Sequence, residues 1–176
     1  KRKADRKLGS SATQETRRQL AEECLRSGDF ARAEDLFANA LKGLYRTDPD
    51  LMLGLAKAQY GQGKARETRE TLDTLIAANP GFRSTDGHLL YARAVEDLGD
   101  PAAALHEYEA VVQGYPGEEA RARYGLLLKR QGDLAKARTV FQEILTRSDA
   151  LPRYYQRDQR EWIALARSEL ASLSSS

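Results

Sequence analysis

Residues 85–116, TDGHLLYARAVEDLGDPAAALHEYEAVVQGYP, contain the pattern that decides the fold of this chain. Apolar residues recur at spacings of three and four on both sides of Gly99, which is typical of two amphipathic helices. Asp100 and Pro101 suit the cap and the first turn of the second helix. Pro116 then closes the unit. The stretch therefore predicts one helical hairpin.

The same pattern returns along the chain roughly every 34 residues. Each expected turn has a glycine, followed five positions later by a small residue and nine positions later by a large apolar or aromatic one. The glycines are Gly28, Gly63, Gly99 and Gly132, the small residues are Ala33, Thr68, Ala104 and Ala137, and the large residues are Phe37, Leu72, Tyr108 and Phe141. The apolar stripes place Leu20, Cys24, Leu44 and Ile76 on the core side of their helices. This recurrence predicts a stack of similar hairpins.

This repeat resembles the tetratricopeptide repeat (TPR) family over roughly residues 14–152. The resemblance implies an all-α, right-handed superhelical solenoid of four hairpins, in which the small residue packs where two helices cross and the proline ends the second helix. The hairpins are expected at residues 14–48, 49–84, 85–117 and 118–152. In the first hairpin Tyr45 replaces the proline and Pro49 follows four residues later, which predicts a longer second helix.

The two ends of the chain fall outside the repeats. Residues 1–9, KRKADRKLG, are predicted to be a basic linker or tail before a solenoid at 10–152, facing either solvent or anionic lipid. Residues 153–173 predict a helix that caps the stack, with Trp162 as its main apolar contact, and residues 174–176 a frayed tail. The arginines and aromatic residues of that helix have a second interpretation, as a nucleic-acid or lipid patch.

A narrower resemblance concerns location. The run NPGFRSTDGHLLYARAVEDLG, residues 79–99, resembles a group of divergent bacterial TPR proteins, some of which are tethered through an amino-terminal membrane segment. The chain starts at Lys1 rather than at a methionine, which indicates a fragment. We therefore expect a cytoplasmic domain, with an amino-terminal membrane anchor as one option for the longer protein.

Composition argues against several classes of function. The chain carries 28 basic and 26 acidic residues, a net charge of +2, which does not favour nucleic acid. The single cysteine, Cys24, fits a small core residue in a reducing compartment. His88 and His106 lack the spacing of a zinc site, and no phosphate-binding glycine loop or nucleophile elbow occurs. We expect no catalytic residues, no metal, no cofactor and no membrane contact by the solenoid itself.

The remaining candidate for function is the surface formed by the first helix of each hairpin, which lines the concave groove in the TPR family. The residues expected there are Arg18, Glu22, Leu53, Lys57, Tyr60, Leu89, Arg93, Glu96, Leu126 and Lys129. Lys57 and Arg93 would hold acidic groups or carbonyls of an extended peptide, and the apolar members would take its apolar side chains. An ordinary solvated inner face fits the same residues.

The function predicted from the sequence is therefore a non-enzymatic protein-interaction module with an unidentified protein or peptide partner. The alternative is an assembly domain that forms a homodimer through its terminal helix or its convex face. The lysine, asparagine and arginine clamp with which some TPR domains hold chaperone carboxyl termini is missing. Its positions hold Arg18 and Glu22, then Gly54, then Asp86 and Leu90.

Overall fold

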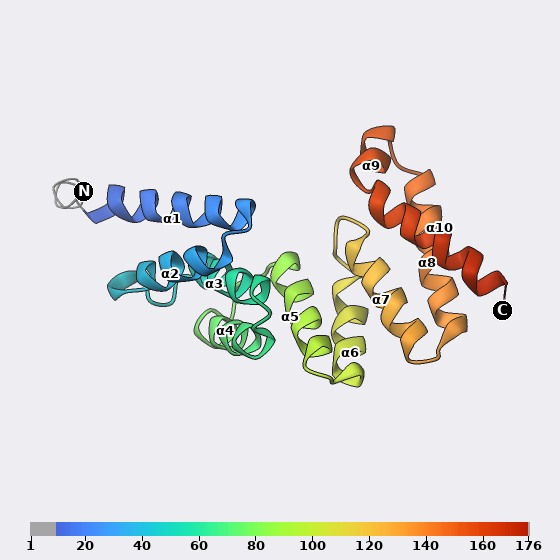
Figure 1. Ribbon diagram of the computed structural model, residues 1–176, viewed down its shortest axis with the longest axis horizontal. Coiled ribbons are helices and arrows are strands. Elements are labelled where there is room, and N and C mark those ends of the chain that lie inside the picture. The colour runs from blue at the N-terminus through green and yellow to red at the C-terminus, as the bar shows by residue number, and fades with distance from the viewer. Residues whose placement is uncertain (1–9, 176) are drawn as a thin grey trace. The chain divides into compact units, whose positions relative to one another are not determined.

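The computed structural model describes residues 10–175, and every regular element in that range is a helix (Figure 1). The helices are α1 (Ser10–Ser27), α2 (Phe30–Ala40), the 3₁₀ turn η1 (Gly43–Tyr45), α3 (Pro49–Gly61), α4 (Ala65–Ala78), α5 (Thr85–Asp97), α6 (Pro101–Val111), α7 (Glu119–Arg130), α8 (Leu134–Asp149), α9 (Arg153–Asp158) and α10 (Arg160–Ser174). The expected all-α fold is confirmed. The basic segment at residues 1–9 lies outside the described residues.

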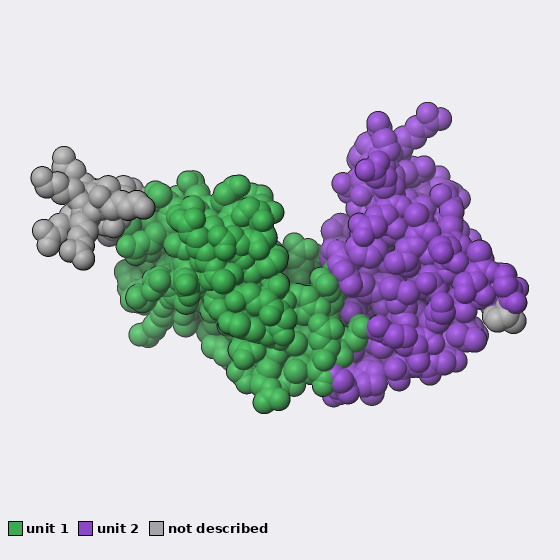
Figure 2. All heavy atoms as spheres, in the orientation of Figure 1, with its two compact units in different colours: residues 1–98 green, residues 99–176 purple. Residues whose placement is uncertain are grey.

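The chain divides into two compact units (Figure 2). Unit 1 ends at Leu98, and unit 2 begins at Gly99. In unit 1 each helix from α1 to α5 packs against the next, and in unit 2 α6 packs on α7 and α7 on α8. This serial antiparallel packing is the hairpin arrangement that the repeat predicts. The helices of the expected third hairpin fall in different units, α5 in unit 1 and α6 in unit 2.

Glycine makes the tight turn between consecutive helices possible. Gly28, Gly63, Gly99 and Gly132 all have φ between +78° and +86°. Side-chain-bearing residues rarely adopt this left-handed conformation, so glycine is the residue that ends a helix there with least strain. The four regularly spaced glycines in the sequence therefore mark real turns between helices.

Caps fix the beginnings of the later helices. The Oδ1 atom of Asp48 accepts a hydrogen bond from the amide of Leu51 at 3.0 Å, and that of Asp100 accepts one from Ala103 at 3.1 Å. Pro49 and Pro101 stand in the first turns that follow. Both caps confirm the Asp-Pro signals in the sequence.

The predicted extension of the second helix is wrong. α2 ends at Ala40, and Gly43 has φ +57°, a conformation that cannot continue a right-handed helix. The additional residues before Asp48 instead form the separate turn η1, where the side chain of Leu44 is 98% exposed. The expectation that Leu44 belongs to the core fails for the same reason.

The core of unit 1 follows the centres of the apolar stripes. Cys24 and Phe37 are 4% and 1% exposed, so the interpretation of Cys24 as a core residue is confirmed. Leu20 and Ile76, expected in the same stripes, are 40% and 53% exposed. They lie at the stripe margins, which the neighbouring helices do not cover.

The end of the chain caps unit 2, but as two helices rather than one. α10 packs against α8 and α7 and buries Ile163, Ala166 and Leu173. Gln159 lies between α9 and α10, and its side-chain Oε1 accepts a hydrogen bond from the amide of Glu118 at 2.8 Å. Ser174 is the last residue of α10, and Ser175 is its C-cap.

Candidate functional site

The candidate surface lies on the first helices of successive hairpins. Within unit 1, α3 contacts both α1 and α5, so residues on these three helices occupy neighbouring positions. Of the residues expected in the groove, Arg18 and Glu22 are on α1, Leu53, Lys57 and Tyr60 on α3, and Leu89, Arg93 and Glu96 on α5. Leu126 and Lys129 are on α7, in unit 2.

Tyr60, Arg93 and Asp97 form the centre of the surface in unit 1. The Arg93 Cζ atom lies 4.7 Å from the centroid of the Tyr60 ring, within the range of a cation–π interaction. The Tyr60 hydroxyl donates a hydrogen bond to Oδ2 of Asp97 at 2.7 Å. These contacts join α3 to α5 and hold a guanidinium, a phenol ring and a carboxylate together.

The sequence predicted Tyr60 and Arg93 but missed Asp97. Asp97 follows Arg93 by four positions and is therefore on the same side of α5. That spacing was the available signal. Asp97 is exposed, and Tyr60 and Arg93 are partly exposed, so all three are accessible to a partner.

Lys57 lies on α3 one turn before Tyr60 and is partly exposed. Its ammonium group makes no ion pair and no side-chain hydrogen bond with the part of the chain that the structure describes. Its three hydrogen-bond donors are therefore not used by the described residues.

Leu53 and Leu89, expected to receive apolar side chains of a peptide, are instead part of the core, 9% and 4% exposed. Leu53 belongs to a cluster with Met52, Leu72 and Leu90. A Cβ atom at Gly87 of α5 would lie 3.4 Å from Cδ1 of Leu53, which shows how closely α3 and α5 approach. Both leucines support the surface from beneath, and the apolar group left at the surface is the Tyr60 ring.

Arg18 and Glu22 pair with each other on α1, with 3.1 Å between Nε and Oε1. The hydrogen bond that Arg18 donates to Glu22 raises the pKa of Arg18. The pair is partly exposed and close to neutral as a unit, which makes it a weak electrostatic site.

In unit 2 Lys129 already forms an ion pair with the terminal helix. Its Nζ atom lies 2.6 Å from Oε2 of Glu169 on α10. Leu126 is partly buried on the same helix, α7. Lys129 therefore stabilises the docking of α10, a role that the sequence did not predict.

Gly54 occupies the clamp position on α3, where a side chain would have to displace a buried ring. A Cβ atom there would lie 2.4 Å from the ring of Phe37, which is 1% exposed. An asparagine at this position would require the Phe37 ring to move. Asp86 is exposed in the first turn of α5, and Leu90 is buried, so neither supplies a cationic group.

Within residues 10–175 no three His, Cys, Asp or Glu side chains come together as a set of metal ligands. The helices over the same range include none that combines the length and the apolar composition of a membrane span.

Comparison with solved structures identifies the fold. The crystal structure of MamA matches with 15% identity and a TM-score of 0.66, covering 94% of this chain and 96% of that chain. YrrB, described as "a TPR protein with an unusual peptide-binding site", matches with 18% identity and a TM-score of 0.62, covering 88% and 83%. A tetratricopeptide repeat protein from Parabacteroides merdae matches with 20% identity and a TM-score of 0.65, covering 91% and 63%.

Sequence comparison points to the same family. No curated protein sequence matches the chain significantly. Two models of the tetratricopeptide repeat match it, one over residues 25–94 and the other over residues 89–152. Together they span most of the chain, and the helices within them are the hairpin elements described above. The chain belongs to the tetratricopeptide repeat family and has its all-α solenoid fold.

Proposed function

We propose that this protein binds an extended segment of a partner polypeptide on the α3–α5 face of unit 1, defined by Lys57, Tyr60, Arg93 and Asp97. The TPR fold supports a protein-interaction module, since TPR domains generally bind proteins or peptides and are typically non-catalytic. The observation that carries the finer proposal is the stacking of Arg93 on Tyr60, whose hydroxyl is held by Asp97.

These contacts prepare the face for binding. Arg93 is held against an aromatic ring, so its guanidinium loses less conformational freedom when it binds a carboxylate or a carbonyl. Lys57 supplies a second cation one helical turn from Tyr60. The Tyr60 ring offers apolar area, and Asp97 can accept a hydrogen bond from a peptide amide. We expect a segment that combines acidic and apolar residues.

Selection from a displayed random-peptide library tests the proposal without a known partner. Selected peptides are measured by calorimetry on the parent and on the Lys57→Glu, Arg93→Glu double variant. The matched control is Arg66→Glu, Arg69→Glu on α4, which changes the net charge equally and lies on a second helix. We expect the face variant to lose at least about tenfold in affinity, or 1.4 kcal/mol, and the control to keep it.

Equal binding by the two variants, or failure to select any peptide, would contradict the proposal. Thermal melting of both variants separates binding from folding. The alternative function, self-association, predicts a mass that increases with concentration in light scattering. Ile163, Ala166 and Leu173 of α10 are already buried within unit 2, so these three residues are not available to a homodimer through that helix.

A cytoplasmic location belongs to the same proposal. The one cysteine of the chain, Cys24, is free and buried, which suits a reducing compartment. Fluorescence microscopy of the longest natural form, fused to a fluorescent protein, tests it. Signal outside the cytoplasmic side would contradict the location and leave the binding proposal intact.

A further inference from the structure

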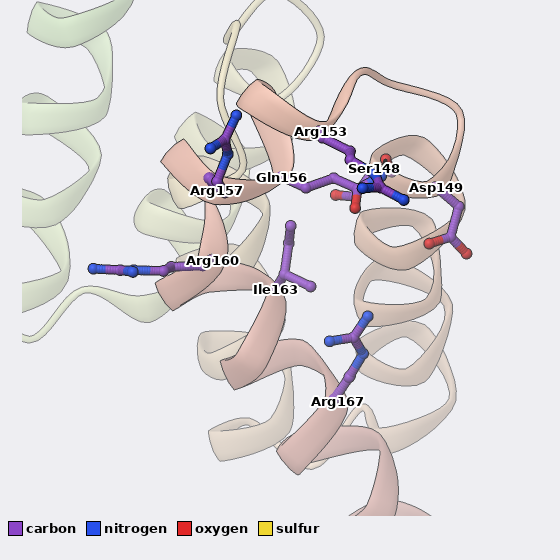
Figure 3. Close-up of a pocket in the computed structure, with 8 residues that line it drawn as sticks. All are labelled: Ser148, Asp149, Arg153, Gln156, Arg157, Arg160, Ile163 and Arg167. Atoms are coloured by element: carbon purple, nitrogen blue, oxygen red, sulfur yellow. Dashed lines mark hydrogen bonds between the residues drawn. The ribbon is translucent and has the colours of Figure 1, made fainter.

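A pocket of about 490 Å³ lies in unit 2, where α8, α9 and α10 meet (Figure 3). Four arginines line it, two from α9 and two from α10, and Ile163 forms an apolar part of its wall. They are Arg153, Arg157, Arg160 and Arg167. The only acidic side chain in the lining is Asp149. We call this site the arginine pocket.

The four guanidinium groups have no partners in the described part of the chain, either as ion pairs or as side-chain hydrogen bonds. Other arginines of unit 2 are paired, as Arg123 is with Glu119 at 2.7 Å and Arg147 with Glu118 at 3.1 Å. Several unpaired cationic side chains around one pocket raise its positive potential, which favours an anionic ligand. The arginine pocket is therefore an unneutralised cationic site.

Ser148 is a second and independent polar feature of the pocket. It lines the pocket and is 2% exposed, and its Oγ atom has no hydrogen-bond partner among the described residues. A buried hydroxyl without a partner costs free energy, which a ligand atom that accepts its hydrogen bond would offset.

A buried network holds the arginine pocket in shape. Glu118 is 0% exposed, and its carboxylate accepts hydrogen bonds from the Tyr155 hydroxyl at 2.9 Å and from Arg147 Nε at 3.1 Å. Gln156 on α9 donates to the carbonyl of Ser148 on α8 at 3.0 Å. These bonds fix α9 against α8, so the arginines project from a rigid base.

The arginines do not all point the same way. Arg153 and Arg167 reach toward α8, on which Ser148 lies, whereas Arg157 and Arg160 point away from it (Figure 3). The first two are therefore the inner pair, and the other two extend the cationic surface outward.

We propose that the arginine pocket binds oxyanion groups of an acidic polypeptide segment, with the inner pair and Ser148 holding one carboxylate or phosphorylated side chain. Guanidinium groups match such oxyanions by paired hydrogen bonds. The volume exceeds that of one small ion and suits a chain with several acidic groups, some held by the outer pair.

Single-stranded nucleic acid fits the site less well, because it is held by exposed aromatic rings that stack on its bases. Of the nearby aromatic residues, Tyr155 is hydrogen-bonded to Glu118 through its hydroxyl. The Trp162 ring is covered by Arg123, whose Cζ atom lies 5.3 Å from the ring centroid. Only Tyr154, 70% exposed, remains available.

Fluorescence anisotropy with labelled peptides tests the proposal on the full chain. The probes are an oligoglutamate peptide and a serine-glycine peptide of equal length carrying one phosphoserine, which distinguish the two oxyanion sources. We expect saturable binding of at least one, weakened by salt. Arg153→Ala with Arg167→Ala should lower its affinity at least about tenfold. The control, Arg66→Ala with Arg69→Ala on α4, should retain it.

Ser148→Ala gives a readout that a purely structural role would not produce. It should weaken peptide binding several-fold without lowering the melting temperature, because the hydroxyl it removes has no partner. Unchanged affinity in this variant would overturn the proposal, as would equal losses in the inner-pair variant and the control.

Three further results would also overturn it. They are loss of binding in Lys57→Glu, Arg93→Glu but not in the inner-pair variant, full competition by inorganic phosphate at the peptide's own concentration, and tighter arginine-dependent binding of a single-stranded oligonucleotide. The two proposals fail separately, because a peptide that depends on the inner pair supports the arginine pocket whatever happens at the α3–α5 face.

Discussion

Gly54 has no side chain because the ring of Phe37 occupies the space that one would fill. The same relation recurs in unit 2, where a Cβ atom at Gly125 would lie 2.7 Å from the ring of Phe141. Both rings are buried, at 1% and 0% exposure. A glycine on a first helix thus allows an aromatic residue of a second helix to approach the backbone closely.

Replacing Gly54 with alanine should therefore destabilise the protein despite the better helix propensity of alanine. We expect the free energy of unfolding to fall by about 1–3 kcal/mol, the usual cost of overpacking a core. Gly81→Ala is the matched control, since a Cβ atom there meets nothing within 4 Å. Urea unfolding of the two variants measures the difference, and equal stability would show that Phe37 moves without cost.

Tyr155 gives a pH-dependent prediction at the same scale. Burial, together with its hydrogen bond to Glu118, raises the pKa of the Tyr155 phenol above its ordinary value of 10.0. The folded state then holds the phenolic proton more tightly than the unfolded state, so stability falls as pH rises through the folded pKa. Below the ordinary value this contribution is fully present.

The parent should therefore lose melting temperature more steeply above about pH 10 than Tyr155→Phe, which has no phenolic proton at this position. Tyr155→Phe should also be less stable at neutral pH, because Glu118 loses a buried hydrogen-bond donor. Thermal melts across alkaline pH check both statements. Parallel curves for the two proteins would show that Tyr155 does not couple to folding.

At the scale of elements, the sequence predicted helices well and some of their ends poorly. The helix ends at the Asp-Pro pairs and at the glycine turns were predicted correctly, because a cap or a left-handed glycine is set by local chemistry. At the break between α9 and α10, Gln159 accepts a hydrogen bond from the amide of Glu118, 41 positions away. No spacing rule within residues 153–173 contains that information.

Substitutions at two alanines of α10 test the docking of this helix on unit 2. Ala166 is 0% exposed, whereas Ala164 on the same helix is exposed. Ala166→Asp should lower the free energy of unfolding by at least about 2 kcal/mol, because it buries a charged group without a partner. Ala164→Asp should change it by less than about 0.5 kcal/mol.

Urea unfolding measures both variants, and binding of an apolar fluorescent dye should increase only for Ala166→Asp, as α10 separates from α8. Similar stabilities would mean that α10 does not cap unit 2. The sequence predicted Trp162 as the main apolar contact of the capping helix. Trp162 is partly exposed, however, and the buried residues of α10 are Ile163, Ala166 and Leu173.

At the scale of the whole molecule, the repeat predicted the family and which helices carry the candidate surface. It did not predict which residues on those helices are accessible. Leu53 and Leu89 share helices with Tyr60 and Arg93 yet lie in the core, because accessibility depends on how closely α3 and α5 pack. The sequence did not predict the arginine pocket either, since its arginines were interpreted as part of a cap or as a nucleic-acid or lipid patch on one helix, and the contribution of α8 to the pocket lining depends on the fold.

The most direct test of the central proposal is the backbone amide NMR spectrum of the protein during titration with a selected peptide. Binding on the α3–α5 face predicts that the largest chemical-shift changes fall on α3 and α5 around Lys57, Tyr60, Arg93 and Asp97, with small changes on α4. Changes confined to α2 and α4, or to unit 2, would contradict it.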